Sequence, residues 1–142
     1  MTERVDFYIL SDHTATGRLQ LACRLAEKAF ERGHTIYIYC VDDGQAQQVD
    51  DLLWTFKQNS FVPHALYPSL PDEMAPVRIG SAPAPDWDAE VLINLTLAVP
   101  DFYPCFQRIV ELVDQEPMVL QASRQRFKVY REQGLAPQTH KL

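Results

Sequence analysis

Apolar and polar positions alternate with two different periods along the chain. Residues 5–10 (VDFYIL) are short, β-branched and aromatic, which predicts a first strand. Residues 35–40 (TIYIYC) are almost continuously apolar, as in a strand that is covered on both faces. Between these runs, apolar residues recur at helical spacing, which predicts a helix that ends at Gly33. The apolar stripe of this helix consists of Leu19, Ala22, Cys23, Ala26 and Phe30.

The rest of the chain continues this alternation. A second helix is predicted from Asp42 or Asp43 to about Phe56, and a last helix from Pro117 to about Glu132. The other predicted elements are strands at 77–79 and 90–95, an apolar run at 109–113, a short helix at 102–106 and a proline-rich, mostly irregular segment at 68–85. The pattern predicts a Rossmann-like α/β fold with three layers, in which helices cover both faces of a mostly parallel sheet.

Folds of this class often bind nucleotides, but the residues for such a site are missing from the sequence. The loop after the first strand, SDHTATGR, has one glycine and none of the phosphate-binding motifs. Asp42 and Asp43 follow the second strand, where dinucleotide-binding folds place their ribose-binding acid. Without the glycines, we interpret both as helix-capping residues and predict no nucleotide site.

Length and composition predict one globular domain that spans residues 1–142. The chain has 46% hydrophobic and 23% charged residues, and no apolar run approaches the roughly 20 residues that cross a bilayer. The opening MTERVDFYIL does not resemble a signal peptide, and an odd number of cysteines in apolar surroundings indicates reduced packing residues of a cytoplasmic protein. The net charge of −6 argues against indiscriminate binding of nucleic acid by the whole surface. The three cysteines are Cys23, Cys40 and Cys105.

Catalytic and metal-binding patterns are also missing from the sequence. The four histidines are scattered, and none has metal-ligand spacing to another. Ser11, Asp12 and His13 are adjacent, whereas the members of a catalytic triad are brought together in space, so we interpret this stretch as a loop. We therefore predict no catalytic residue, no metal and no cofactor.

Trp54 falls outside the apolar face of the second predicted helix. At about 100° per residue, the apolar residues of this helix form one arc that faces the sheet, and Trp54 falls on the polar side. Phe61 and Pro63 follow in the next loop. Either this loop folds back and covers Trp54, or the three residues form a hydrophobic docking patch, because exposed tryptophan is a favoured interface anchor. The inward-facing arc consists of Ala46, Val49, Leu52, Leu53 and Phe56.

The last predicted helix, PMVLQASRQRFKVYRE, combines basic and aromatic residues. Arg124, Lys128 and Arg131 follow one another at i, i+4 and i+7 and form one ridge, with Phe127 and Tyr130 beside it. A cationic ridge next to aromatic rings suits a ligand that is both negative and apolar, such as an acidic peptide end with a bulky residue. The alternative is a solvated helix face whose aromatic residues pack on the sheet.

Four short motifs, spread over nearly the whole chain, occur together in one protein family. They are the opening strand FYIL, the stretch FVPH at a set interval after LLW, the pair INL and DFYPCF, and the closing RQRFKVYR. From Phe7 to about Gly134, the chain resembles the chi subunit family of bacterial DNA polymerase III holoenzyme. The resemblance implies an α/β fold that is similar to nucleotide-binding proteins but lacks nucleotide activity.

The resemblance also implies partners. Chi belongs to the clamp-loader complex, where it pairs with the psi subunit. It also binds the acidic C-terminal tail of single-stranded DNA-binding protein, which ends in phenylalanine. Trp54 and Phe61, with Pro63 beside them, match the psi-contacting surface of the family.

The tail-binding residues of the family match the last helix. Arg124, Phe127 and Lys128 stand at the matching positions, and Arg131 extends the same ridge. One position differs, because Leu120 stands where relatives have a lysine that helps to bind the tail. We therefore expect either a lower affinity for the tail or a charge that is supplied from elsewhere.

The leading hypothesis is a non-catalytic heterodimer partner of psi that reaches DNA only indirectly and contacts no membrane. The main alternative is a small α/β nucleotide-binding protein or enzyme with an unrecognised site. A third hypothesis is direct binding of DNA through the last helix, with steep dependence on salt.

Overall fold

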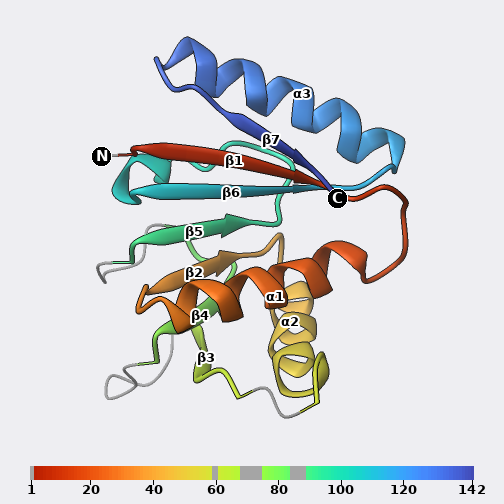
Figure 1. Ribbon diagram of the computed structural model, residues 1–142, viewed down its shortest axis with the longest axis vertical. Helices are drawn as coiled ribbons and strands as arrows, with labels where there is room; N and C mark the ends of the chain where they lie inside the picture. The colour runs from red at the N-terminus through yellow and green to blue at the C-terminus, as the bar shows by residue number, and fades with distance from the viewer. Residues whose placement is uncertain (1, 59–60, 68–74, 84–88) are drawn as a thin grey trace.

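A seven-stranded parallel sheet forms the centre of the molecule. The computed structural model describes residues 2–58, 61–67, 75–83 and 89–142. Within them the strand order is β3-β4-β2-β5-β6-β1-β7, and every pair of neighbouring strands is parallel. The strands are β1 (Arg4–Ile9), β2 (Ile36–Tyr39), β3 (His64–Tyr67), β4 (Val77–Gly80), β5 (Val91–Asn94), β6 (Arg108–Val113) and β7 (Gln138–Lys141) (Figure 1).

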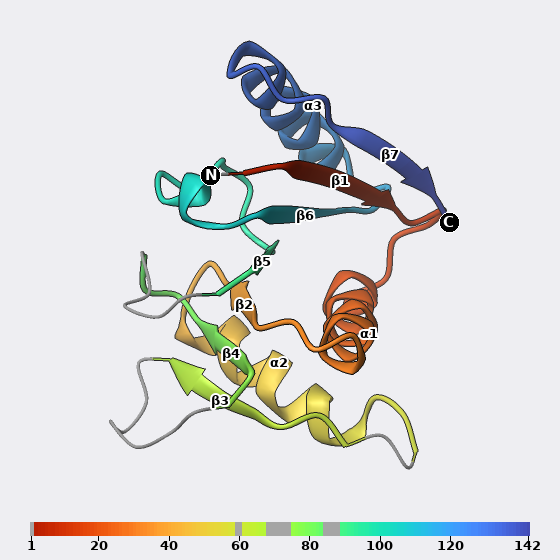
Figure 2. The ribbon, with the colours of Figure 1, turned by 60° about the vertical axis from the view of Figure 1, so that its left-hand side comes forward.

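Helices cover both faces of this sheet, so the predicted three-layer α/β fold is confirmed. One face carries α1 (Gly17–Glu31) and α2 (Asp43–Thr55), and the other carries α3 (Pro117–Glu132) (Figure 2). A short 3₁₀ helix, η1 (Tyr103–Cys105), lies between β5 and β6 in the chain. None of the described helices is long and apolar enough to cross a membrane.

Strand β2 contributes apolar side chains to the core on both faces of the sheet. Ile36 and Ile38 belong to the core under α1 and α2. Tyr37, one residue along, belongs to the core on the side of α3, where its ring stacks on Phe106 with 6.4 Å between ring centroids. A central parallel strand needs apolar side chains on both faces, which is why this run is almost continuously apolar.

A charged pair is buried between β6 and α3. The Nε of Arg126 donates to Oε1 of Glu111 at 3.0 Å, and both side chains are almost fully excluded from solvent. Asn94 and Tyr130 also donate to this carboxylate, Tyr130 through its hydroxyl at 2.6 Å. Burial raises the pKa of Glu111, and the charge of Arg126 and the hydrogen bonds oppose that rise.

A second buried carboxylate, Asp6, holds the last strand on the sheet. Nε2 of His140, on β7, lies 2.9 Å from Oδ1 of Asp6, and the His140 ring stacks on Tyr8. Arg4 and Arg108 contact the other oxygen of Asp6 at 2.8 and 2.9 Å. Burial by itself would raise the pKa of Asp6. The hydrogen bonds from His140 and Arg108 and the charges of Arg108 and Arg4 outweigh it and hold this pKa below its usual value.

The structure differs from the sequence prediction in two places. Strands β3 and β7 were not predicted, because each lies at an edge of the sheet and shows no run of apolar residues as continuous as those of the central strands. Cys105 is exposed, so the prediction of three packing cysteines is wrong for this residue; Cys23 and Cys40 are buried, and burial raises the pKa of both thiols to about 12. The strand predicted at 77–79 within the proline-rich segment 68–85 is confirmed as β4, and residues 68–74 and 84–85 of that segment lie outside the described part.

Candidate protein-binding surfaces

Helix α2 presents one face to the sheet and Trp54 to solvent. The helix begins after Asp42, whose side chain accepts a hydrogen bond from the backbone N–H of Gln45 at 2.8 Å, as the capping interpretation predicts. Ala46, Val49 and Leu53 are buried against the sheet. The predicted direction of Trp54, away from this face, is confirmed, because 58% of the residue is exposed.

Trp54 and Phe61 lie together and both remain accessible. Their ring centroids are 6.1 Å apart in an edge-to-face arrangement, and 72% of Phe61 is exposed. The loop does fold back to contact Trp54, but it does not cover it. Pro63 follows, partly buried, directly before β3.

Strand β3 adds an apolar residue that the sequence analysis missed. Its register pairs His64 with Val77 and, through β4, with Ile36 of β2, so His64 and Leu66 lie on the side of the sheet that carries α2. Leu66 is 36% exposed and lies on the same side as Trp54 and Phe61. We call Trp54, Phe61 and Leu66 the aromatic patch, after its two aromatic residues. Recognition of β3 as a strand would have assigned Leu66 to this face.

The side chain of His64 supports the patch from below. Its Nδ1 lies 2.6 Å from the carbonyl oxygen of Val62, and its Nε2 lies 3.4 Å from Oδ1 of Asp50. The ring is 4.6 Å from that of Trp54, centroid to centroid, and only 1% of the side chain is exposed. The buried His64 ring therefore packs against the indole of Trp54 on the side facing the protein, and the opposite side of the indole remains exposed to solvent.

The basic residues of α3 divide between the surface and the core. Arg124, Lys128 and Arg131 are exposed and form the basic ridge. The Nζ of Lys128 lies 3.9 Å from Oε1 of Glu132, one helical turn away. Arg126 is buried on Glu111 and contributes nothing to the ridge.

The two aromatic residues of α3 also have different environments. Tyr130 is fully buried, so it belongs to the core and not to the surface beside the ridge. Phe127 is partly buried, with its ring 5.4 Å from that of Phe7 on β1. Of the two rings, Phe127 is the one that a ligand on the ridge can reach.

Two hollows meet at Arg124 and Phe127. One, of about 380 Å³, lies along the ridge itself and is lined by Arg124, Phe127, Lys128, Arg131 and Glu132. The other, of about 500 Å³, lies between α3 and the strands β1 and β7. It has an apolar wall that includes Ile9 and Leu120, and Lys141 on β7 also lines it. The sequence analysis missed Lys141 because it did not predict β7.

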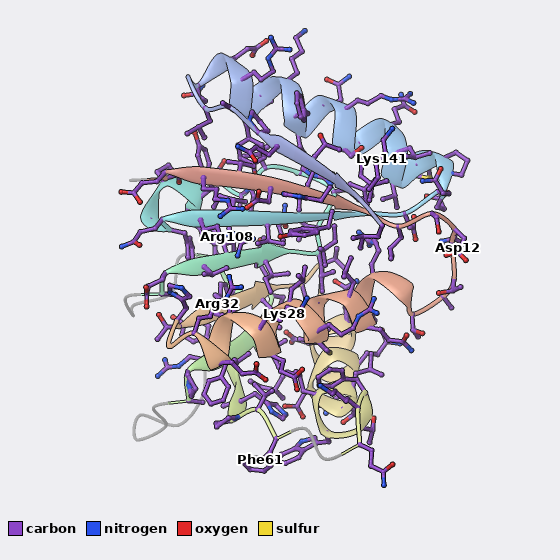
Figure 3. All side chains as sticks on the ribbon, viewed as in Figure 1. Asp12, Lys28, Arg32, Phe61, Arg108 and Lys141 are labelled. Atoms are coloured by element: carbon purple, nitrogen blue, oxygen red, sulfur yellow. The ribbon has the colours of Figure 1, made fainter. Side chains whose placement is uncertain are left out.

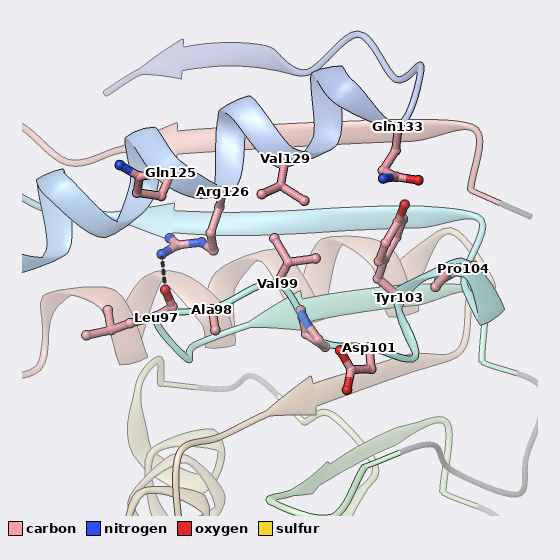
Figure 4. A pocket seen from close by; sticks show the side chains of 11 residues that line it. Leu97, Ala98, Val99, Asp101, Tyr103, Pro104, Gln125, Arg126, Val129 and Gln133 are labelled. Carbon is pink, nitrogen blue, oxygen red and sulfur yellow. Dashed lines mark hydrogen bonds between the residues drawn. The ribbon is translucent and has the colours of Figure 1, made fainter.

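A larger hollow, of about 640 Å³, lies on the other flank of α3 (Figure 4). Its walls come from residues 97–104 and from α3, and Arg126 lines it while its Nη1 donates to the carbonyl oxygen of Leu97 at 3.1 Å. The lining is mostly apolar, with Asp101 as its one carboxylate.

No metal cluster occurs among the described residues, and His13 pairs with an aspartate that is distant in the sequence. No group of three or more histidine, cysteine, aspartate or glutamate side chains among them could hold a metal ion. His13 pairs with Asp114, 2.7 Å from Nδ1 to Oδ2, in a small hollow after the ends of β1 and β6.

The family model of the DNA polymerase III chi subunit, HolC, matches residues 1–138. The chain belongs to this chi subunit family. A protein of Pseudomonas aeruginosa named DNA polymerase III subunit chi is 45% identical over 139 residues, which cover 98% of this chain and 96% of that protein. Proteins of the same name from Escherichia coli and Haemophilus influenzae are 34% and 30% identical and cover 90% and 94% of the chain, with equal shares of their own lengths.

As a chi subunit, the chain is an accessory subunit of the replication polymerase. The resemblance stated from the motifs is confirmed. The family match includes the aromatic patch and the basic ridge, and it ends before Lys141.

Proposed function

We propose that this chi subunit is a non-catalytic adaptor. It binds the psi subunit of the clamp-loader complex through the aromatic patch and Pro63. It binds the C-terminal tail of single-stranded DNA-binding protein through the basic ridge and Phe127. DNA is reached only through that protein, and no cofactor takes part.

The observation that carries this proposal is the placement of the two surfaces at opposite ends of the molecule. The aromatic patch lies beside β3, at one edge of the sheet, and the basic ridge lies on α3 next to β7, at the other edge. Phe61 and Lys141 mark the two ends in Figure 3. Two partners can therefore bind at once without contact between them, as an adaptor requires.

The chemistry of the patch supports a protein partner. Trp54 and Phe61 are large, exposed aromatic residues held against each other, and His64 fixes the indole from beneath. Aromatic residues of this kind carry much of the binding energy in protein interfaces. A preformed arrangement also reduces the conformational entropy that is lost on binding.

The chemistry of the ridge supports an acidic, phenylalanine-ended peptide. The terminal ring fits the apolar hollow between α3, β1 and β7, which Phe127 and Leu120 line. The guanidinium of Arg124, at the same hollow, can bind the terminal carboxylate with two parallel hydrogen bonds. Lys128 and Arg131 then lie along the path of the upstream aspartates.

Lys141 can compensate for the lysine that relatives have at the position of Leu120. Leucine at that position extends the apolar wall of the hollow, and Lys141 supplies an ammonium group from β7 on the same hollow. We infer that Lys141 supplies, from the neighbouring strand, the positive charge that the matching lysine supplies in relatives.

Sedimentation of the chain with purified psi subunit and a labelled tail peptide tests the proposal. A complex of all three is expected, in which Trp54→Ala releases psi alone and Arg124→Ala releases the peptide alone. If psi and the peptide exclude each other, the chain is not an adaptor between them. Titration with ATP, NAD and single-stranded DNA tests the alternatives, and saturable micromolar binding of any of them would support those alternatives instead.

A further inference from the structure

The two edges of the sheet differ in how they are protected. Edge strands expose unpaired backbone groups, and proteins commonly protect them with charged side chains, lysine above all. Strand β7, with the sequence QTHK, is polar and ends in Lys141. Strand β3, with the sequence HALY, has apolar residues from Ala65 to Tyr67 and no lysine or proline. Within the described residues, β3 has a strand neighbour on one side only.

The register shows which backbone groups of β3 face the open side. The backbone N–H of Ile36 donates to the carbonyl oxygen of Pro76, and that of Cys40, after β2, donates to the carbonyl oxygen of Gly80. The backbone groups of the even-numbered residues of β4 therefore face β2. The backbone groups of the odd-numbered residues of β4 therefore face β3. Because a residue in a parallel ladder bonds to the neighbours of its register partner, Ala65 and Tyr67 are the residues of β3 that bond to β4.

A close approach confirms this direction. The carbonyl oxygen of Tyr67 lies so near Gly80 that a side chain at Gly80 would collide with it. Since backbone groups alternate along a strand, the N–H and C=O groups of His64 and Leu66 face away from β4.

The side chains place the open edge next to the aromatic patch. Leu66 is on the α2 side of the sheet, together with Trp54 and Phe61. An extended segment paired with β3 would direct every second side chain onto that patch. One added strand could therefore bond to the outward-facing backbone groups of β3 and contact the side chains of the aromatic patch at the same time.

We propose that the psi subunit adds a strand of its own to the edge of β3 that has no strand neighbour among the described residues, through hydrogen bonds to the backbone of His64 and Leu66. The inference rests on the proposed binding of psi to the aromatic patch. The partner segment is extended, with apolar side chains at alternate positions that contact Trp54, Phe61 and Leu66. The sheet thereby continues from one subunit into the other.

Substitution of Leu66 by proline or by alanine distinguishes the contribution of the backbone to psi binding from that of the side chain. Leu66→Pro removes an N–H that faces outward and leaves the ladder to β4 in place, whereas Leu66→Ala removes only side-chain contacts. Loss of one backbone hydrogen bond and the strain on its neighbours should weaken psi binding by about tenfold beyond Leu66→Ala. Ala65→Pro, whose N–H faces β4, is the control that should destabilise the fold itself.

Amide exchange of the wild-type chain gives a second measurement that does not depend on a variant. In the complex, the amide of Leu66 should exchange at least about tenfold more slowly than in the free chain, as expected for a new backbone hydrogen bond. If Leu66→Pro does not fold, this measurement decides the question.

Three outcomes separate this inference from the proposed function. Tenfold weaker binding by Leu66→Pro or slower exchange at Leu66 supports the added strand. Equal binding by Leu66→Pro and Leu66→Ala, with unchanged exchange at Leu66, overturns it. If Trp54→Ala still weakens binding in that case, psi docks through side chains and the proposed function stands. Failure of wild-type chain to bind psi overturns both.

Discussion

Arg124 and Arg126, two residues apart on α3, lie on opposite sides of the helix. Arg124 is exposed on the basic ridge, and Arg126 is buried with its Nε 3.0 Å from Glu111. Two residues of a helix are separated by about 200° of rotation, so neighbouring arginines of one basic run serve different purposes. One belongs to the proposed binding surface and the other to the core.

Replacement of these two arginines by methionine should separate stability from binding. Arg126→Met leaves Glu111 as an uncompensated buried carboxylate and should lower the free energy of unfolding by about 3 kcal/mol or more. Arg124→Met should change it by less than about 0.5 kcal/mol, as expected for an exposed residue. Urea unfolding of both variants checks this. Similar small losses would show that the buried pair contributes little.

Truncation of the aromatic patch should weaken psi binding without loss of stability. Trp54→Ala and Phe61→Ala should each reduce the free energy of binding by about 2 kcal/mol, the value typical of an interface anchor. Calorimetric titration with psi measures this loss, and thermal unfolding should show melting temperatures close to the wild type.

Phe56→Ala is the matched control for those variants, because Phe56 ends the same helix but packs against the core. It should lower stability by roughly 2 kcal/mol and leave the patch in place. A fall in stability for Trp54→Ala as large as that for Phe56→Ala, with unchanged psi binding, would assign Trp54 to the core.

Residues of the basic ridge should differ in their dependence on salt. Arg124→Ala should lose about 2 kcal/mol of tail binding, because a paired carboxylate contact is lost. Lys128→Ala and Arg131→Ala should lose less, and their losses should shrink in high salt, because exposed charges are screened. Calorimetry with the tail peptide measures the losses. A peptide without its final phenylalanine should bind the wild type poorly, and equal binding of both peptides would show that the terminal ring and carboxylate are not recognised.

The positive charge next to Leu120 should prove to come from Lys141. Lys141→Ala should weaken binding of the tail peptide by up to about 1 kcal/mol, a value typical of one accessible ion pair. Adding Leu120→Lys to this variant should restore part of the affinity. Lys28→Ala, on the opposite face of the sheet, serves as the control for net charge. No difference between Lys141→Ala and Lys28→Ala in peptide titrations would remove Lys141 from the site.

Stability should depend on pH through Asp6. The folded-state pKa of Asp6 is lowered, so its contribution is present above the unfolded pKa of about 3.9 and is lost as the pH falls through the folded value. Urea unfolding of the wild type and Asp6→Asn should therefore differ most near neutral pH. The difference should shrink below about pH 4, where the unfolded carboxyl takes up its proton. A difference that grows on acidification would contradict this assignment.

The α/β fold could be predicted from the sequence because its central elements carry strong patterns. Strand β2 is apolar on both faces, and α2 has an apolar arc from which Trp54 departs, so both the layers and the direction of Trp54 were predictable. Each of these patterns reflects burial against at least one neighbouring layer.

The edge strands could not be predicted in the same way. A strand such as β7 needs only backbone pairing on one side, so its sequence QTHK shows no apolar period. The contributions of Leu66 and Lys141 depend on those strands and were missed with them. Tyr130 was placed beside the ridge because helical spacing alone does not show how deep a ring lies, whereas the structure buries its hydroxyl on Glu111.

The order of strands has a mechanical consequence for an adaptor that is held at both edges. A pull between partners at β3 and β7 acts across the strands, so it passes through all six strand pairings in series, and each ladder bears the full tension. Helix α1, which packs over β2, β5 and β6, is a brace in parallel with the middle ladders. Helix α2 packs over β3 and β4 and braces that ladder in the same way. The ladder between β1 and β7 has four register pairs, and among the described residues no helix packs as closely over its two strands. Under load we therefore expect the sheet to yield there first, next to the basic ridge.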